Sequence, residues 1–191
     1  MYKLCKTEQS AQRQRQLEEG LLTAMKTKRY EEITISDLCE QMGIPRKSFY
    51  RYFSSKDGAL HALIDHTLLD FEQHTGILSG NAAGDAHQDL RHFFEFWHRR
   101  KQLLDALERS GLSGVLIQRA ISYSRELDTL PRFMVISDRH LRDYGTMYAV
   151  VGMMTMLVQW YHDGFQPGVE QMAGLVIRLM SEPLFSPMSE K

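Results

Sequence analysis

Residues 43–56 of the chain read GIPRKSFYRYFSSK. This segment contains no acidic residue, and its bases and aromatic residues are Arg46, Lys47, Phe49, Tyr50, Arg51, Tyr52, Phe53 and Lys56. The chain of 191 residues has a net charge of only −1. Residues 1–58 carry 11 Lys and Arg against 8 Asp and Glu, whereas the remainder carries 12 against 16. A basic head on an acidic body indicates that the head meets a polyanion, although charge alone also fits a solvated helix.

The residues before this segment predict a helix that ends at a tight turn. Thr34 to Asp37 match a capping box, with Asp in the position that Glu usually occupies. Apolar residues then recur at helical spacing at Ile35, Leu38, Cys39 and Met42. Gly43 suits a left-handed cap after this helix, and Pro45 suits the first position of the next one. The sequence therefore predicts two short helices joined by a glycine turn.

Such a pair of helices forms a helix-turn-helix, whose second helix enters the major groove of DNA. If Phe49 and Phe53 pack inward, then Arg46, Lys47, Tyr50 and Arg51 lie outward or lateral. Ser48 can reach a base or a phosphate, and Tyr52 offers an O–H donor at the rim. Ser54 to Asp57 predict a second capping box, where Lys56 would hold a phosphate at the start of a long helix.

The segment from residue 8 to about 72 resembles the N-terminal domain of TetR-type transcriptional repressors. The matching residues are Glu31–Leu38, Met42–Ile44, Ser48–Tyr50, Tyr52–Phe53, Ser55–Lys56 and Leu60. The resemblance implies that Thr34 and Ser36 contact phosphates or base edges, that Arg46, Lys47 and Ser48 read the groove, and that Tyr50, Tyr52 and Lys56 grip the backbone. Pro45, Lys47 and the pair Gly58–Ala59 depart from the family pattern, so the base preference cannot be copied from relatives.

Helical spacing recurs along the whole chain, and strand-like alternation is scarce. We therefore expect an all-α fold. The resemblance implies a three-helix DNA-binding domain at 1–54, joined by a long helix to a larger ligand-binding and dimerisation domain at 55–191. The first helix is expected over about 8–26, and the long helix reaches about Gln73. Further helices are expected over about 87–100, 101–110, 113–127, 138–163 and 168–181.

The resemblance implies that the last two helices form a dimer, since a single helix-turn-helix makes few contacts and usually binds a palindrome as a two-fold pair. The predicted interface residues are Gly145, Gly152, Met153, Met156, Met172, Leu175 and Leu179. An intramolecular core helix is the alternative for this region. Residues 144–162 contain no Asp, Glu, Lys or Arg, but their polar content and flanks favour a buried helix over a membrane span.

Repressors of this type usually bind a small molecule in the body. The candidate wall consists of Phe94, Trp97, His98, Tyr123, Tyr148 and Trp160. Aromatic residues of this kind also describe an ordinary core. His92, Glu95 and His98 could meet a metal ion, but the usual i, i+4 pair of His is missing.

The sequence therefore predicts a DNA-binding transcription regulator, most simply a repressor that binds a palindromic operator as a homodimer. Expected partners are double-stranded DNA, a second copy of the chain and an unidentified small-molecule effector, with no membrane and no cofactor. Two alternatives stay open: a regulator controlled by a protein partner without a small-molecule pocket, and an all-helical metal-dependent enzyme. No catalytic motif is present. Two cysteines and the lack of a secretory signal favour the cytoplasm.

Overall fold

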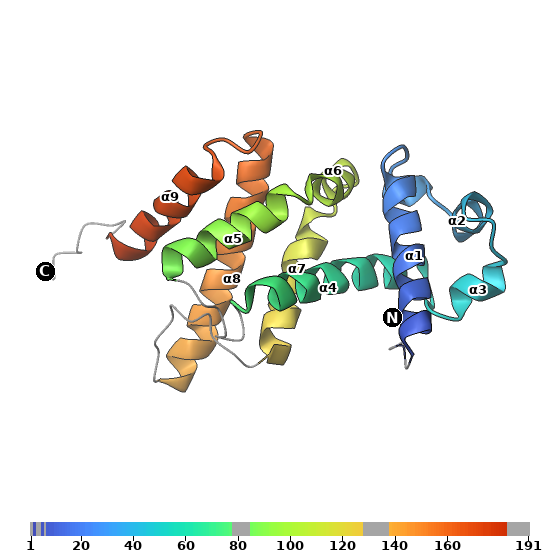
Figure 1. Cartoon of the computed structure of the whole chain (residues 1–191), viewed down its shortest axis with the longest axis horizontal. Helices are drawn as coiled ribbons and strands as arrows, with labels where there is room; N and C mark the ends of the chain where they lie inside the picture. Colours follow the sequence, from blue (N-terminus) through green and yellow to red (C-terminus); the bar gives the residue numbers. More distant parts are fainter. Residues whose placement is uncertain (1, 3–4, 6, 78–84, 128–137, 183–191) are drawn as a thin grey trace, which may run out of the picture. The chain divides into compact units, whose positions relative to one another are not determined.

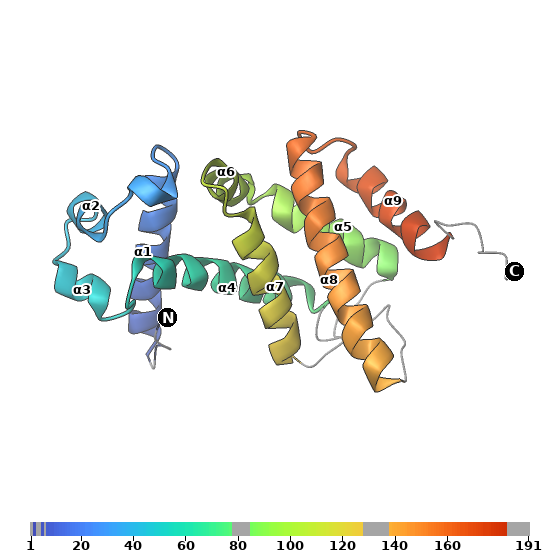
Figure 2. The same cartoon turned by 180° about the vertical axis from the view of Figure 1, so that it is seen from behind.

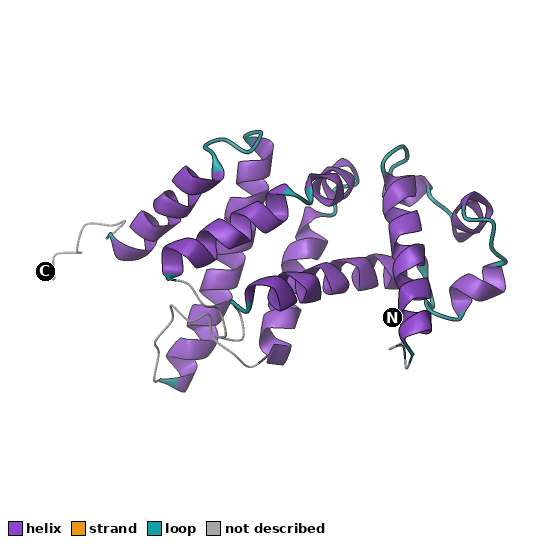
Figure 3. Cartoon of the chain, viewed as in Figure 1, coloured by secondary structure: helices purple, strands orange, loops and turns teal. Residues whose placement is uncertain are grey.

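The computed structural model of the chain describes residues 2, 5, 7–77, 85–127 and 138–182. The described residues form an all-α fold of nine α-helices and one short 3₁₀ helix (Figures 1 and 3). In chain order these are α1 (Glu8–Met25), η1 (Tyr30–Glu32), α2 (Ile35–Gln41), α3 (Arg46–Tyr50), α4 (Lys56–Thr75), α5 (Ala86–His98), α6 (Lys101–Arg109), α7 (Ser113–Leu127), α8 (Arg139–His162) and α9 (Val169–Ser181). The predicted all-α class is confirmed, and the bounds of the predicted helices agree to within two residues.

The chain divides into two compact units, and each combines two segments that are separated in the sequence. The first contains residues 1–70 and 101–126, and the second contains residues 71–100 and 127–191. Thus α6 and most of α7 belong to the same unit as the helix-turn-helix. Compact packing does not establish which segment folds by itself, so the predicted division after residue 54 stays a prediction.

The first unit is built on the apolar stripe of α1. Leu21 and Met25 are fully buried, and they share the core with Leu38 of α2, Phe49 of α3 and Ile64 of α4. Burying one such side chain stabilises a fold by roughly 1.5–3 kcal/mol. This core holds the short α2 and α3 in place, because helices of seven and five residues are too short to be stable by themselves.

The second unit is built around α5, which lies alongside α9 (Figures 1 and 2). Its rings meet edge to face, as in Phe94 against Trp160, whose centroids are 5.1 Å apart. The buried residues of α9 are Met172, Ala173 and Val176. None of the helices in the described part of the chain combines the length and the hydropathy that a bilayer span needs.

Candidate nucleic-acid interface

The start of α2 is fixed by the capping box that the sequence predicted. The Oγ1 of Thr34 accepts a hydrogen bond from the backbone N–H of Asp37 at 3.1 Å, and the Asp37 carboxylate accepts from the backbone N–H of Thr34 at 3.0 Å. The hydrogen bond from the Thr34 backbone is the main reason that the pKa of Asp37 lies below its usual value. The arrangement leaves Thr34 and Ser36 exposed at the beginning of the helix.

The turn between α2 and α3 depends on Gly43. Its φ of +62° lies in the left-handed region, which confirms the predicted glycine cap. The backbone N–H of Ile44 then donates to the Cys39 carbonyl at 2.9 Å, which closes the end of α2. Pro45 precedes α3 as its N-cap and is not its first residue, one position from the prediction.

The short helix α3 is held by its aromatic residues and presents its bases. Phe49 and Phe53 are 1% and 0% exposed, and their ring centroids lie 5.2 Å apart. Arg46, Lys47 and Arg51 are exposed, as is Tyr50, whereas Ser48 is half-buried. The inward and outward faces predicted from the spacing are therefore confirmed for this helix. The result is a rigid element with three cations on its solvent side.

Two residues predicted to contact the DNA backbone have contacts inside the protein, and their role at the DNA stays a prediction. Tyr52 is only 8% exposed, so its ring belongs largely to the core, and it also lines a groove together with Ser48 and Arg51. The Lys56 ammonium donates to the backbone carbonyls of Tyr30 and Ile33, at 2.7 Å for the latter. It also lies 4.1 Å from the centroid of the Tyr30 ring. Lys56 therefore ties α4 to η1, and the sequence spacing did not reveal these acceptors.

The second capping box is also displaced from its predicted position. The hydroxyl of Ser55 accepts from the backbone N–H of Gly58 at 3.1 Å, so Ser55 and not Ser54 caps α4. The error is one residue, because two adjacent serines both fit the pattern and only the backbone conformation separates them.

The sequence reasoning overlooked a groove beside α3. Its volume is about 510 Å³, and Arg13 and Gln16 of α1 line it together with Ser48 and Arg51. Arg13 thus joins the cations of the candidate interface from a different helix. The only signal in the sequence was that Arg13 occupies a solvent-facing position of the first helix, and many arginines share that property.

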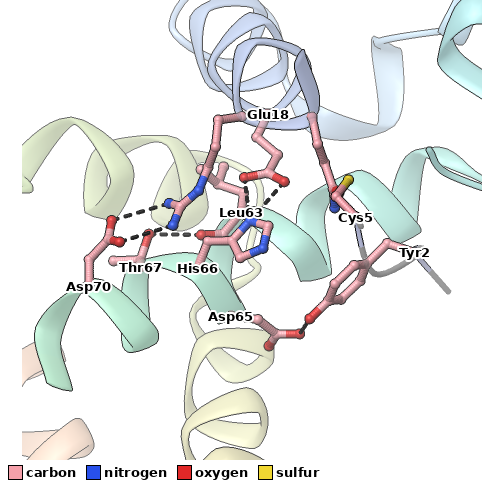
Figure 4. A network of polar contacts seen from close by, with 10 residues as sticks. Tyr2, Cys5, Glu18, Leu63, Asp65, His66, Thr67 and Asp70 are labelled. Carbon is pink, nitrogen blue, oxygen red and sulfur yellow. Dashed lines mark hydrogen bonds and ion pairs between the residues drawn. The ribbon is translucent and has the colours of Figure 1, made fainter. Parts of the chain in front are cut away.

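Polar contacts hold α1 on α4, as Figure 4 shows, and an ion pair holds α7 on α4. Glu18 is 1% exposed, and the Nδ1 atom of His66 lies 2.8 and 2.9 Å from its two carboxylate oxygens. Asp65 accepts hydrogen bonds from the Tyr2 hydroxyl at 2.8 Å and from the Arg119 guanidinium. The hydrogen bond to Asp65 is the main reason that the pKa of Arg119 lies above its usual value. Charges on three segments thereby fix α4, the helix that follows the helix-turn-helix.

The predicted ligand residues differ in their burial and lie in both compact units. Phe94, Trp97 and Trp160 are between 0% and 2% exposed and form the core of the second unit. The His98 ring lies 5.9 Å from the Trp160 ring and 4.7 Å from the Phe165 ring, whereas Tyr148 is 78% exposed. Tyr123 is half-buried on α7 in the first unit. The ligand-binding role of these six residues stays a prediction, since aromatic composition does not distinguish a pocket from a core.

The predicted dimer residues lie on α8 and α9 and differ in their burial. Leu175 and Leu179 are exposed on α9, whereas Met172 is 6% exposed and packs inside its own unit. On α8, Met153 and Met156 are half-buried, as are Gly145 and Gly152. No group of three or more His, Cys, Asp or Glu in the described ranges is placed to hold a metal ion.

The comparisons with known proteins concern this same N-terminal region. Residues 23–63 match the family model described as bacterial regulatory proteins, tetR family. Over 41 residues the chain is 46% identical to the HTH-type transcriptional regulator EthR of Mycolicibacterium smegmatis, a match that covers 22% of this chain and 19% of that relative. Residues 23–63 form a TetR-type helix-turn-helix. This TetR-type head contains η1, α2, α3 and the beginning of α4.

A solved structure extends the likeness beyond the TetR-type head. The fatty acid degradation regulator FadR from Bacillus halodurans matches with a TM-score of 0.57 at 14% identity. The match covers 95% of this chain and 98% of that one. At this identity the likeness concerns the helical fold alone. The EthR regulator shares only about a fifth of its length with this chain.

Proposed function

We propose that the chain is a transcription regulator that places α3 in the major groove of duplex DNA. The observation that carries this proposal is the exposed face of α3, where Arg46, Lys47 and Arg51 project from a helix anchored by two buried phenylalanines. A guanidinium can pair with guanine through two hydrogen bonds, and an ammonium can reach base acceptors or phosphates. Thr34 and Ser36 at the start of α2 would add contacts to the phosphate backbone.

The regulator would act as a homodimer on a palindromic operator, because one short recognition helix reads only a few base pairs. The support for a dimer is apolar surface on the second unit. Leu141, Tyr144 and Tyr148 of α8 are 60%, 75% and 78% exposed, and Leu175 and Leu179 of α9 are also exposed. Exposed apolar side chains on two helices favour association with a second copy.

An effector would control DNA binding, and repression that ends when the effector binds is the simplest form of control. The buried Trp97 supports a ligand in the second unit, because its indole N–H has no acceptor in the described part of the chain. A buried donor without a partner costs about 1–3 kcal/mol, which a polar group of a ligand would recover. By linkage, an effector that weakens operator binding must itself bind less tightly to the DNA complex.

Selection of bound sequences from random DNA tests the proposal most directly. The expected result is a palindrome with two half-sites, bound by two chains. The absence of any enriched sequence, together with a monomeric protein that ignores duplex DNA at low salt, would overturn the proposal. A thermal-shift survey of small metabolites tests the effector separately. Uniformly unchanged melting temperatures would remove the effector and leave DNA recognition standing.

A further inference from the structure

A basic groove lies in the second unit, away from every residue assigned above to DNA, effector or dimer. It has a volume of about 260 Å³, and it is formed by the last turn of α4 and one face of α5. His74 of α4 lines the groove with His92, Glu95 and Phe96 of α5, and Arg99 and Arg100 line it where α5 ends. The groove collects cations, although residues 59–191 carry an excess of acidic groups.

The arginines of this groove differ in how they are held. The guanidinium carbon of Arg100 lies 3.4 Å from the centroid of the Phe96 ring, a cation–π contact that restrains the side chain. Arg99 is much freer, with a side chain that is 77% exposed and 3.9 Å from the Glu95 carboxylate. Their backbone N–H groups donate to carbonyls of α5, so both side chains start from a fixed helix end. One cation is therefore positioned, and the other can close on a ligand.

The lining indicates the chemistry of the ligand. Guanidinium groups match the oxygens of phosphates and carboxylates, and imidazole nitrogens can add further donors. The volume lies slightly below the range of about 300–1,000 Å³ for sites of drug-sized molecules, so it suits a small ion or the anionic end of a larger one. Glu95 also lines the groove, and its carboxylate repels an anion.

We propose that this groove binds a small oxyanion, that is, a phosphate or carboxylate group, between Arg99 and Arg100. The proposal does not depend on the proposed function, since it concerns the protein without DNA.

Calorimetric titration of the full chain with pyrophosphate at constant ionic strength tests the site. We expect one saturable site per chain. Arg99→Gln should weaken binding about tenfold, the loss of one charge-assisted contact. Glu95→Gln should strengthen binding, because it removes the competing carboxylate. The control is Arg178→Gln on α9, whose arginine is equally exposed and pairs with the exposed Glu182. This variant should leave the affinity unchanged.

Three results would overturn the proposal. The first is a wild-type chain without saturable heat. The second is an equal loss in Arg99→Gln and Arg178→Gln, which would indicate a general effect of charge. The third is a loss in Arg46→Gln that Arg99→Gln does not produce, which would place the anion on α3. Since Arg99 and Arg178 are both highly exposed, circular dichroism should find every variant folded.

Discussion

At the scale of single residues, a substitution of Lys56 distinguishes a structural role of this side chain from a DNA-binding role. Lys56→Met keeps the apolar stem of the side chain but removes the ammonium that donates hydrogen bonds to the carbonyls of Tyr30 and Ile33. We expect the free energy of unfolding to fall by about 1–3 kcal/mol, because two carbonyls lose a charged partner. Urea denaturation measures this change.

The control for Lys56 is Lys47→Met, which should leave stability within about 0.5 kcal/mol because Lys47 is exposed. If Lys56→Met instead preserved stability and lowered the slope of log K against log salt by about 0.9 per phosphate, the predicted phosphate contact would be supported and the structural role contradicted.

Arg46 and Lys47 are the residues that should confer sequence preference. Arg46→Ala or Lys47→Ala should weaken binding to the selected operator by about 1–3 kcal/mol while changing binding to random DNA much less. Fluorescence anisotropy on both duplexes provides the comparison. An equal loss on the two duplexes would reassign the residue to a phosphate contact.

The residues of the head also mark the limit of prediction from sequence. The capping box at Thr34 and the glycine turn were predictable because they depend on residues within a few positions. The contacts of Lys56 were not, because its acceptors lie 23 and 26 residues earlier in the chain. Tyr50 and Tyr52 look alike in sequence, yet one is exposed and the other buried. Only the packing of α3 on its neighbours distinguishes them.

At the scale of elements, the contact between α4 and α7 depends on Asp65 and Arg119. Asp65 is 7% exposed, and the two atoms of its carboxylate accept from the Arg119 guanidinium. Asp65→Asn should lower the free energy of unfolding by about 2–3 kcal/mol, because the guanidinium loses its charged partner while it remains partly buried. Chemical denaturation measures this loss.

A double-mutant cycle with Arg119→Met isolates the pair. We expect a coupling free energy of about 0.5–3 kcal/mol between Asp65 and Arg119. Independent, additive losses in the two single variants would contradict a direct contribution of this ion pair to the packing of α7 on α4.

The half-buried Tyr2 and the buried Tyr30 join segments of the first unit and make its stability sensitive to alkali. Burial, followed by the hydrogen bond donated to Asp57, raises the pKa of Tyr30, and burial with the bond to Asp65 raises that of Tyr2. A tyrosine in the unfolded chain ionises near pH 10. Above that pH the unfolded state binds fewer protons than the folded state. The stability that these tyrosines provide is therefore complete below about pH 10 and declines as pH rises towards the folded-state values.

Urea denaturation between pH 8 and about pH 11 measures this dependence. The double variant Tyr2→Phe, Tyr30→Phe should lose stability less steeply above about pH 10 than the wild type, by up to about 1.4 kcal/mol per pH unit for each tyrosine. Other titrating groups affect both proteins, so the difference between them reports the tyrosines. Parallel declines would contradict the assignment.

At the scale of the whole molecule, the positions of the helices in the sequence were easier to predict than the helices against which each one packs. The bounds of α7 follow from local periodicity, and the structure agrees with them. Its membership in the unit of the helix-turn-helix follows from side chains such as Arg119, which bonds to Asp65, 54 positions earlier. Nothing near α7 in sequence encodes those partners. The second copy of the chain in the proposed dimer is likewise a partner that local sequence does not specify.

The dimer can be tested through one exposed residue of α9. Leu175→Glu places a charge on the apolar surface of the second unit without disturbing the core, since Leu175 is 41% exposed. We expect sedimentation to find a monomer with unchanged helicity. Operator affinity should fall about a hundredfold, because two half-sites no longer act as one bivalent site. Gln88→Glu adds the same charge at an exposed position of α5 and should remain dimeric. A dimeric Leu175→Glu with full operator affinity would instead mean that α9 does not form the interface, which would leave the exposed tyrosines of α8 as the surface to change next.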